Sequence, residues 1–156
     1  MPSYYRDPDA PEPNAPRKIG VGALIERDGL VLVERRADSI VEEWAFIGGS
    51  LEDESVLDAL NREVLEETGF EIEQATLFGV FSDPTRVVAH PDGTVCRITS
   101  VVFRVTPAGR NEPIPSEESA EMRFVSRADL ARLTFWPAHR PIRDAFLADP
   151  ASPVVA

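Results

Sequence analysis

The stretch that decides the fold covers residues 48–70 and reads GGSLEDESVLDALNREVLEETGF. A glycine pair opens it, and residues 54–68 carry apolar side chains at the spacing of one amphipathic helix. Gly69 follows at once, and glycine readily takes the left-handed conformation with which many helices end. The stretch therefore predicts a break at the glycine pair, a helix over residues 54–68 and a stop at Gly69.

Three glutamates, Glu63, Glu66 and Glu67, lie in the last turns of the predicted helix. A helix C-terminus carries partial negative charge, so each carboxylate there is disfavoured by roughly 0.3–1 kcal/mol, and like-charged neighbours add to the repulsion. On a helical wheel, Glu63 and Glu67 fall beside or within the apolar stripe that contains Leu60 and Val64. An ordinary solvent-facing acidic run would point away from that stripe.

Carboxylates at the rim of a core need a partner, because an unpaired buried charge costs several kcal/mol. Arg62 can pair with Glu66 at i,i+4 spacing, but it cannot serve all three glutamates. Clustered carboxylate oxygens suit Mg²⁺ or Mn²⁺. Upstream, Glu52, Asp53 and Glu54 fit either metal binding or simple capping of the helix N-terminus, where acidic residues are favoured. We therefore expect a divalent-metal site along this helix.

The same stretch resembles the Nudix box of the Nudix hydrolases. The matching positions are Gly48, Glu54 and residues 62–70, all at the spacing of the box. Ile47 and Asp53 depart from the common pattern, in which many members have proline and glycine, respectively. Neither departure removes a carboxylate, although Asp53 adds a charge near the expected metal and could alter metal number or affinity.

The resemblance implies an α/β fold, specifically a Nudix-type α/β/α sandwich with a mixed β-sheet. It implies Mg²⁺, with Mn²⁺ as a substitute, and catalytic roles for Glu63, Glu66 and Glu67, with Arg62 orienting the carboxylates. A glutamate of the box or of a downstream loop would act as general base. Residues 115–124 (PSEESAEMRF) supply such a loop, in which Glu118 is our candidate beside Glu117 and Glu121. The implied metal ligands are the Gly48 carbonyl, Glu54, Glu63, Glu66 and Glu67.

The implied activity is that of a pyrophosphohydrolase, in which metal-activated water cleaves a diphosphate linkage in a nucleoside diphosphate derivative. Candidate substrates are ADP-ribose-like compounds and nucleoside triphosphates, including 8-oxo-dGTP. Two alternatives stay open. The chain is a non-catalytic nucleotide-sensing module on the same fold, or it is an interaction protein with a solvated acidic helix and no response to metal.

Residues outside the box must select the substrate. Arginines could bind terminal phosphates or merely solvate strand ends, and aromatic residues could stack on a base or pack in the core. We assign no role to His90 and His139. The substrate-binding candidates are Arg36, Trp44, Phe46 and Arg86, with Trp136 as a further aromatic.

Composition limits the partners. The 156 residues are 43% apolar and 28% charged, which is typical of one soluble globular domain, and no apolar run is long enough for a membrane span. The net charge of −11 disfavours a nucleic-acid polymer but allows a small nucleotide or nucleotide-sugar if a cation mediates. A single cysteine, Cys96, excludes an intrachain disulfide and a cysteine-based zinc site. No signal-peptide pattern is present, so we expect a cytoplasmic protein without membrane partners.

The remainder of the chain predicts three parts. Residues 1–17 form a proline-rich extended arm, either disordered or packed on the domain or on a second copy in a homodimer. Residues 18–149 form the Nudix hydrolase domain, and residues 150–156 form a tail. Asp28-Gly29 predicts a hairpin turn. The expected strands are 18–27, 30–36, 41–47, 71–83, 95–106 and 121–125, and the further helices are 127–133 and 141–147.

Overall fold

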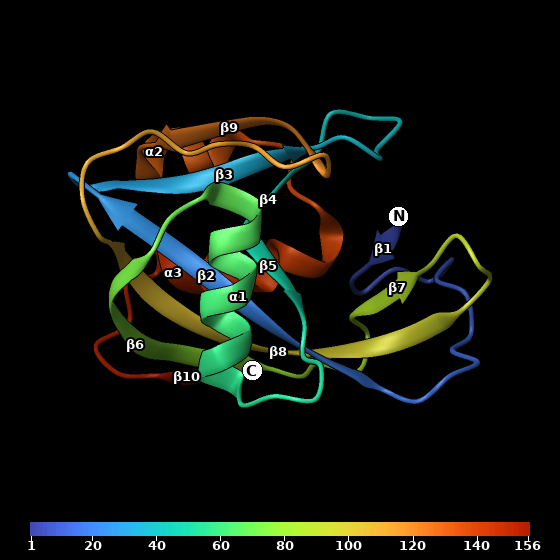
Figure 1. The fold of residues 1–156 in the computed structure, drawn as a ribbon. Helices are drawn as coiled ribbons and strands as arrows, with labels where there is room; N and C mark the ends of the chain where they lie inside the picture. Colours follow the sequence, from blue (N-terminus) through green and yellow to red (C-terminus); the bar gives the residue numbers. More distant parts are fainter.

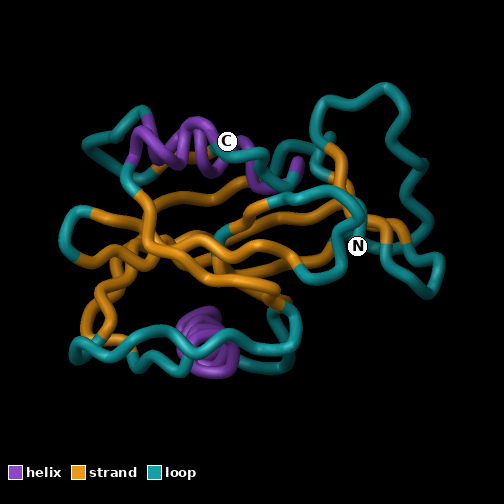
Figure 2. The backbone as a smooth tube through the Cα atoms, turned by 90° about the horizontal axis from the view of Figure 1, so that it is seen from above, coloured by secondary structure: helices purple, strands orange, loops and turns teal.

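The computed structural model describes residues 1–156 as three layers, in which helices cover both faces of a mixed ten-stranded sheet. Helix α1 (Val56–Thr68) covers one face alone. Helices α2 (Arg127–Arg132) and α3 (Arg140–Leu147), with the short 3-10 turn η1 (Pro137–His139), cover the opposite face, as Figure 2 shows. This is the predicted α/β/α sandwich. No helix is long and apolar enough to cross a membrane.

The sheet is built around β2, which pairs in parallel with β8 on one side and antiparallel with β5 and β3 on the other (Figure 1). Strand β3 continues the sheet to β9 and β4, and β8 continues it to β6 and β7. The strands are β1 (Ser3–Tyr4), β2 (Lys18–Arg27), β3 (Leu30–Arg36), β4 (Trp44–Ala45), β5 (Ile47–Ser50), β6 (Ile72–Phe81), β7 (Val87–Ala89), β8 (Val95–Pro107), β9 (Ser119–Val125) and β10 (Val154–Val155).

Alternation along β2 divides the core into two halves. Ala23 and Ile25 face α1 and pack with Leu60 and Val64, whereas Leu24 faces the other way and joins the cluster that contains α3. Each fully buried Leu or Val side chain contributes roughly 1.5–3 kcal/mol by leaving water. The apolar stripe of α1 therefore holds this helix, with its glutamates, at a fixed angle on the sheet.

The caps of α1 set its length. Ser55 is the N-cap in an extended conformation, and its side chain accepts a hydrogen bond from the Asp58 amide at 3.1 Å. The predicted start at Glu54 is therefore two residues too early, because Ser55 caps the N-terminus and the helix begins at Val56. The predicted stop is confirmed: Gly69 has φ of 75°, and its amide donates to the Leu65 carbonyl.

The glycine pair does not break the chain as predicted. Gly48 and Gly49 lie inside β5, paired with Gly22 and Val21 of β2. A methyl group on Gly48 would collide with the Val21 carbonyl, and one on Gly49 would collide with the Glu63 carboxyl group. Glycine is needed here for close packing against both β2 and α1, and not for a turn.

Both ends of the chain pair with the sheet. In the arm, β1 runs antiparallel to β7, and the Asn14 side chain bonds the β7–β8 turn through the Gly93 carbonyl and the Val95 amide. At the other end, β10 pairs in parallel with β6. The arm is therefore packed, and the disordered alternative is wrong for this structure. The predicted domain boundaries at residues 17 and 149 stay predictions.

Four short elements, β1, β7, η1 and β10, escaped the sequence analysis because two or three residues show no periodicity.

Candidate active site

A cleft of about 370 Å³ lies where the last turns of α1 meet β5, the start of β2, β3 and η1. One part of its lining consists of carboxylates, and we call this part the carboxylate end. Another part consists of rings, and we call this part the aromatic end. The residues of the carboxylate end are Glu34, Glu52, Glu63, Glu67 and Glu118, beside Gly48 and Gly49. The aromatic end consists of Phe46, Trp136 and His139.

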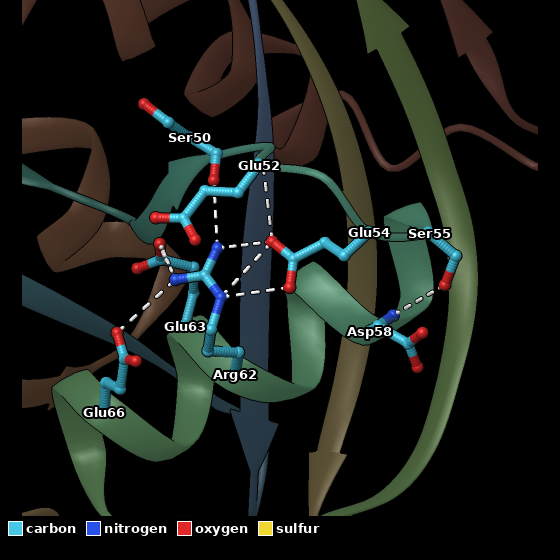
Figure 3. Close-up of polar contacts among 8 residues, drawn as sticks. All are labelled: Ser50, Glu52, Glu54, Ser55, Asp58, Arg62, Glu63 and Glu66. Atoms are coloured by element: carbon cyan, nitrogen blue, oxygen red, sulfur yellow. Dashed lines mark hydrogen bonds and ion pairs between the residues drawn. The ribbon is translucent and has the colours of Figure 1, made fainter.

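Arg62 organises the glutamates of α1, as Figure 3 shows. Its guanidinium contacts Glu54 at 2.6 Å and Glu63 at 2.8 Å, and it lies 3.5 Å from Glu66. It also donates to the Ser50 carbonyl at 3.1 Å, which ties the helix to the end of β5. The hydrogen bonds from Arg62 hold the pKa of Glu54 below its usual value. One arginine therefore fixes three of the four glutamates that the resemblance assigned to metal.

Glu67 is the glutamate that Arg62 does not reach. Its side chain is only 5% exposed, and its Oε2 atom is buried without any hydrogen-bond partner. Burial raises its pKa to about 9, and the nearby carboxylates of Glu34 and Glu63 add to the rise. A carboxyl group in these surroundings favours a proton or a cation, because its ionised form has neither water nor a positive neighbour.

Glu63 connects Arg62 to the floor of the cleft. Its carboxyl group lies against Gly49, where a methyl group would displace it. Burial raises its pKa in spite of the ion pair with Arg62. The glycine of β5 is therefore part of the site, since it makes the space that Glu63 occupies.

Glu34 of β3 is a member of the site that the sequence analysis missed. It is buried in the cleft, accepts a hydrogen bond from the Ser119 hydroxyl, and has its pKa raised to about 7 by burial. A signal was present in the sequence. Alternation along β3 places Glu34 on the same face as Leu32, which packs toward α1.

No three acidic, histidine or cysteine side chains are grouped closely enough to form a ready-made metal site. Arg62 instead holds Glu54, Glu63 and Glu66 against itself, and neither Glu54 nor Glu66 lines the cleft. The donor set nevertheless fits Mg²⁺ or Mn²⁺, because all donors are oxygens and the Glu67 Oε2 atom is unpaired.

The downstream loop brings one of its three glutamates into the cleft. Glu118 lines the carboxylate end, next to Ser119, whose hydroxyl bonds Glu34. Glu121 is instead held by Arg123 at 2.6 Å. Glu117 does not line the cleft.

Two of the four substrate-binding candidates lie in the cleft. Phe46 forms part of the aromatic end. The Arg36 guanidinium lies 4.4 Å from the Trp136 ring centre and pairs with Asp38 at 3.2 Å.

Arg86 cannot bind a phosphate, and the prediction for it is wrong. It is completely buried, and its guanidinium donates to the Ala138 carbonyl at 2.9 Å, the Phe81 carbonyl at 2.6 Å and the Ser100 hydroxyl at 3.0 Å. Burial lowers its pKa to about 10. Arg86 is thus a structural residue that joins β6, β8 and η1.

The prediction for Trp44 is also wrong. Its side chain is buried outside the cleft, where the Arg123 guanidinium lies 4.9 Å from its ring centre. Core packing, the alternative use of an aromatic residue, is its role.

Known proteins resemble this chain both in sequence and in fold. The profile described as NUDIX domain matches residues 16–146. A MutT-like protein of Streptomyces ambofaciens is 38% identical over 64% of this chain, which spans 57% of that protein's length. Nucleoside triphosphatase NudI of Escherichia fergusonii is 35% identical, over 70% of this chain and 82% of the relative.

Two further matches agree with this result. An ADP-ribose pyrophosphatase of Methanocaldococcus jannaschii is 31% identical, over 75% of this chain and 66% of the relative. Among solved structures, the MutT protein of Bacillus halodurans superposes with a TM-score of 0.70 at 21% identity, over 88% of this chain and 86% of the other. The last match concerns the fold, and it agrees with the predicted sandwich.

Proposed function

The chain belongs to the Nudix family, and from this premise we propose that it is a divalent-metal-dependent pyrophosphohydrolase. Its substrate is a nucleoside diphosphate derivative, either a nucleoside triphosphate, including 8-oxo-dGTP, or an ADP-ribose-like compound. The relatives named for nucleoside triphosphates and for ADP-ribose support both classes. Water is the nucleophile that cleaves the diphosphate linkage.

The observation that carries this proposal is the Glu67 carboxyl group. It is buried, has an unpaired oxygen and lies among other carboxylates at the end of a cleft. Such an arrangement costs free energy in the absence of a ligand. A divalent cation removes that cost, whereas a solvated acidic helix of an interaction protein would not have buried Glu67 at all.

Glu63, Glu67 and the Gly48 carbonyl would hold the metal within the cleft, and Glu54 and Glu66 would join from the side of Arg62. When bound, Mg²⁺ or Mn²⁺ supplies positive charge that neutralises the diphosphate and lowers the pKa of a water molecule. Arg62 keeps the carboxylates that are not engaged in place through its ion pairs. The Gly49 position leaves Glu63 the space that it needs.

Glu118 is the general base in this proposal. It is the one glutamate of the predicted loop that lines the cleft, and its neighbour Ser119 is fixed by the hydrogen bond to Glu34. A carboxylate at the open side of the cleft can accept the proton that the attacking water loses.

The cleft also has cations for the phosphates. Lys18 is the only lysine of the chain, lines the cleft and forms no ion pair. Arg36 lines the cleft from β3. In a protein of net charge −11, these side chains and the metal give an anionic substrate a favourable path into an acidic site.

The test is a hydrolysis assay with ADP-ribose, the common nucleoside triphosphates and 8-oxo-dGTP, each with Mg²⁺, Mn²⁺ or EDTA. Product analysis shows which linkage of a nucleoside triphosphate is cleaved. One position gives nucleoside monophosphate and pyrophosphate, and the other gives nucleoside diphosphate and phosphate. We expect metal-dependent turnover of at least one substrate, and a loss of about 10³-fold or more in kcat for Glu67→Gln because it removes a metal ligand. Glu66→Gln is expected to lose less, since its side chain is 60% exposed.

Glu73→Gln is the matched control, because Glu73 is an exposed glutamate of β6 outside the cleft. Turnover that survives Glu67→Gln would refute the site assignment. Metal-dependent nucleotide binding without any turnover would favour the alternative of a sensing module. The cytoplasmic location and a homodimer stay predictions from the sequence.

A further inference from the structure

The pairing of β9 with β3 is irregular beside the cleft. Arg35 lies opposite Glu121, but the next residue of β3, Arg36, lies opposite Ser119 (Figure 1). Ala120 is therefore the extra residue of a β-bulge, and it is exposed. A bulge breaks the regular alternation of side chains and aims the residues beyond it differently.

This bulge turns the Ser119 side chain toward the interior. Met122 and Phe124 of β9 pack on the side of α1, and simple alternation would give the next position on that face to Ala120. Because of the extra residue, Ser119 takes that position. It is buried, and its hydroxyl donates to the Oε2 atom of Glu34. Glu34 is only 6% exposed, so the hydrogen bond is shielded from bulk water.

The bond to β3 is the one side-chain anchor of the loop that carries Glu118. The other side-chain hydrogen bond of this loop is internal, from the Glu118 amide to the Ser116 hydroxyl at 3.3 Å. The Ser119 amide donates to the Ser116 carbonyl at 3.2 Å, and the Ala37 amide donates to the Glu118 carbonyl at 3.1 Å. Ala37 lies in the turn after β3, so only the bulge serine ties the side chains of the loop to the sheet itself.

We propose that Glu34 is a positioning residue, which holds Ser119 and through it keeps the adjacent Glu118 carboxylate at the carboxylate end of the cleft. This inference rests on the proposed function, in which Glu118 is the general base. A base acts only when it lies within hydrogen-bonding reach of the proton that it removes. A loop that shifts therefore slows the reaction without weakening the binding of substrate, and this predicts a lower kcat at an unchanged KM.

Four substitutions at the two ends of the hydrogen bond test this role. Ser119→Ala removes the donor and Glu34→Met removes the acceptor, whereas Ser119→Thr retains a hydroxyl and Glu34→Gln retains an oxygen that can accept. Values of kcat and KM are measured on the substrate identified by the hydrolysis assay. The exchange rate of the Ala37 amide, whose acceptor is the Glu118 carbonyl, is measured by NMR in EDTA without substrate.

We expect Ser119→Ala and Glu34→Met to lower kcat about 10- to 100-fold, with KM within about twofold of wild type, because the base is displaced. The same two variants are expected to speed the exchange of the Ala37 amide about tenfold, since the loop opens more often when a hydrogen bond to a carboxylate is lost. Ser119→Thr and Glu34→Gln are expected to retain kcat within about threefold of wild type.

A second comparison shows whether the effect passes through Glu118. In the background of Glu118→Gln, adding Ser119→Ala is expected to change kcat by no more than about twofold, because the base that it positions is already absent. A serine that only supported the fold would lower kcat by the same factor in both backgrounds.

Ser126→Ala is the matched control, because it removes a serine hydroxyl just after the other end of β9 and outside the cleft. Ser126 caps α2 by accepting from the Asp129 amide at 3.1 Å. The variant is expected to lower the melting temperature while kcat and the exchange of the Ala37 amide stay at wild-type values.

Three results would overturn the inference: wild-type kcat in Ser119→Ala, an equal loss in the background of Glu118→Gln, or unchanged exchange of the Ala37 amide in Ser119→Ala. If Glu34→Gln lost as much activity as Glu34→Met while Ser119→Ala lost none, Glu34 would act through its charge and not through Ser119. A wild-type protein that hydrolyses no substrate would contradict the proposed function, and the exchange rates would still decide whether Glu34 holds the loop.

Discussion

The two ends of the cleft differ in how their polar groups are satisfied. At the carboxylate end, Glu67 has a buried oxygen without a partner, and the pKa values of Glu34, Glu63 and Glu67 are all raised. At the aromatic end, the two main-chain groups of Ala138 and the indole N–H of Trp136 each have a partner. The first end leaves a buried carboxyl oxygen unpaired, whereas the second is a rigid wall whose main-chain groups are paired within the protein.

The largest expected effect tests the rigid wall. Arg86→Met leaves the carbonyls of Ala138 and Phe81 and the Ser100 hydroxyl without their donor inside the protein. We expect the free energy of unfolding to fall by about 3–5 kcal/mol, measured by urea denaturation, since each buried unpaired group costs about 1–3 kcal/mol. Arg97→Met is the control, because Arg97 is exposed and bonds only the Pro84 carbonyl. Equal losses in both variants would show that the buried contacts of Arg86 contribute no more to the free energy of unfolding than the exposed contact of Arg97.

The next effect tests the geometry of the carboxylate end. In Gly49→Ala, the new methyl group would collide with the Glu63 carboxyl group, so this carboxyl group must move. We expect a loss of about 100-fold in kcat/KM, measured on the substrate identified by the hydrolysis assay, because a small displacement of a reactive group is costly. Gly22→Ala is the control, since its methyl group meets the movable Val102 side chain at 3.3 Å. Wild-type activity in Gly49→Ala would contradict the position of Glu63.

A smaller effect concerns stability against pH in EDTA. Glu67 has a folded pKa of about 9 and Glu34 of about 7, whereas unfolded glutamate titrates near about 4.3. Between these values the folded protein retains protons that the unfolded chain releases, so the free energy of unfolding falls as pH rises from about 5 to 9.

Glu67→Gln removes the larger of these contributions. From pH 5.5 to 8.5 we expect its free energy of unfolding to fall by about 1–2 kcal/mol less than that of wild type, measured by urea denaturation in EDTA. Glu73→Gln, on the exposed side of β6, should follow the wild-type curve. Parallel curves for wild type and Glu67→Gln would contradict the raised pKa of Glu67.

The smallest effect concerns the positive charge of Lys18 in the cleft. Lys18→Met is expected to raise KM about two- to fivefold at low salt with little change in kcat, since an exposed cation contributes modestly to binding. The increase should disappear at high ionic strength. Arg110→Met removes the same charge near Asp28, beyond the opposite end of β2, and is the control. If both variants raise KM equally, only net charge matters.

The sequence predicted most of what depends on near neighbours in the chain. The strands Lys18–Arg27 and Leu30–Arg36 and the helix stop at Gly69 are confirmed, because a hairpin turn and a helix end are set within a few residues. The burial of Glu67 also follows from helical period, which places it beside Leu60 and Val64.

The predictions that failed concern residues whose contacts lie far away in the sequence. Glu34 belongs to the site only because β3 passes beside the last turn of α1, and its hydroxyl partner Ser119 is 85 residues away. Arg86 was taken for a surface cation because nothing near it in sequence shows that three acceptors surround it in the fold. Side-chain burial at such positions follows from tertiary packing and not from local pattern.

By itself, then, the sequence determined the row of glutamates on one helix, which follows from residue spacing, and the family and layered fold, which the resemblance of residues 48–70 to the Nudix box implies. Only the tertiary structure decided which carboxyl group is left unpaired, where the N-terminal arm lies and which carboxylate holds the Ser119 hydroxyl. The physical reason is separation along the chain. Phe46 and His139 are 93 residues apart, and only packing of the whole domain brings the amide of one to the ring of the other.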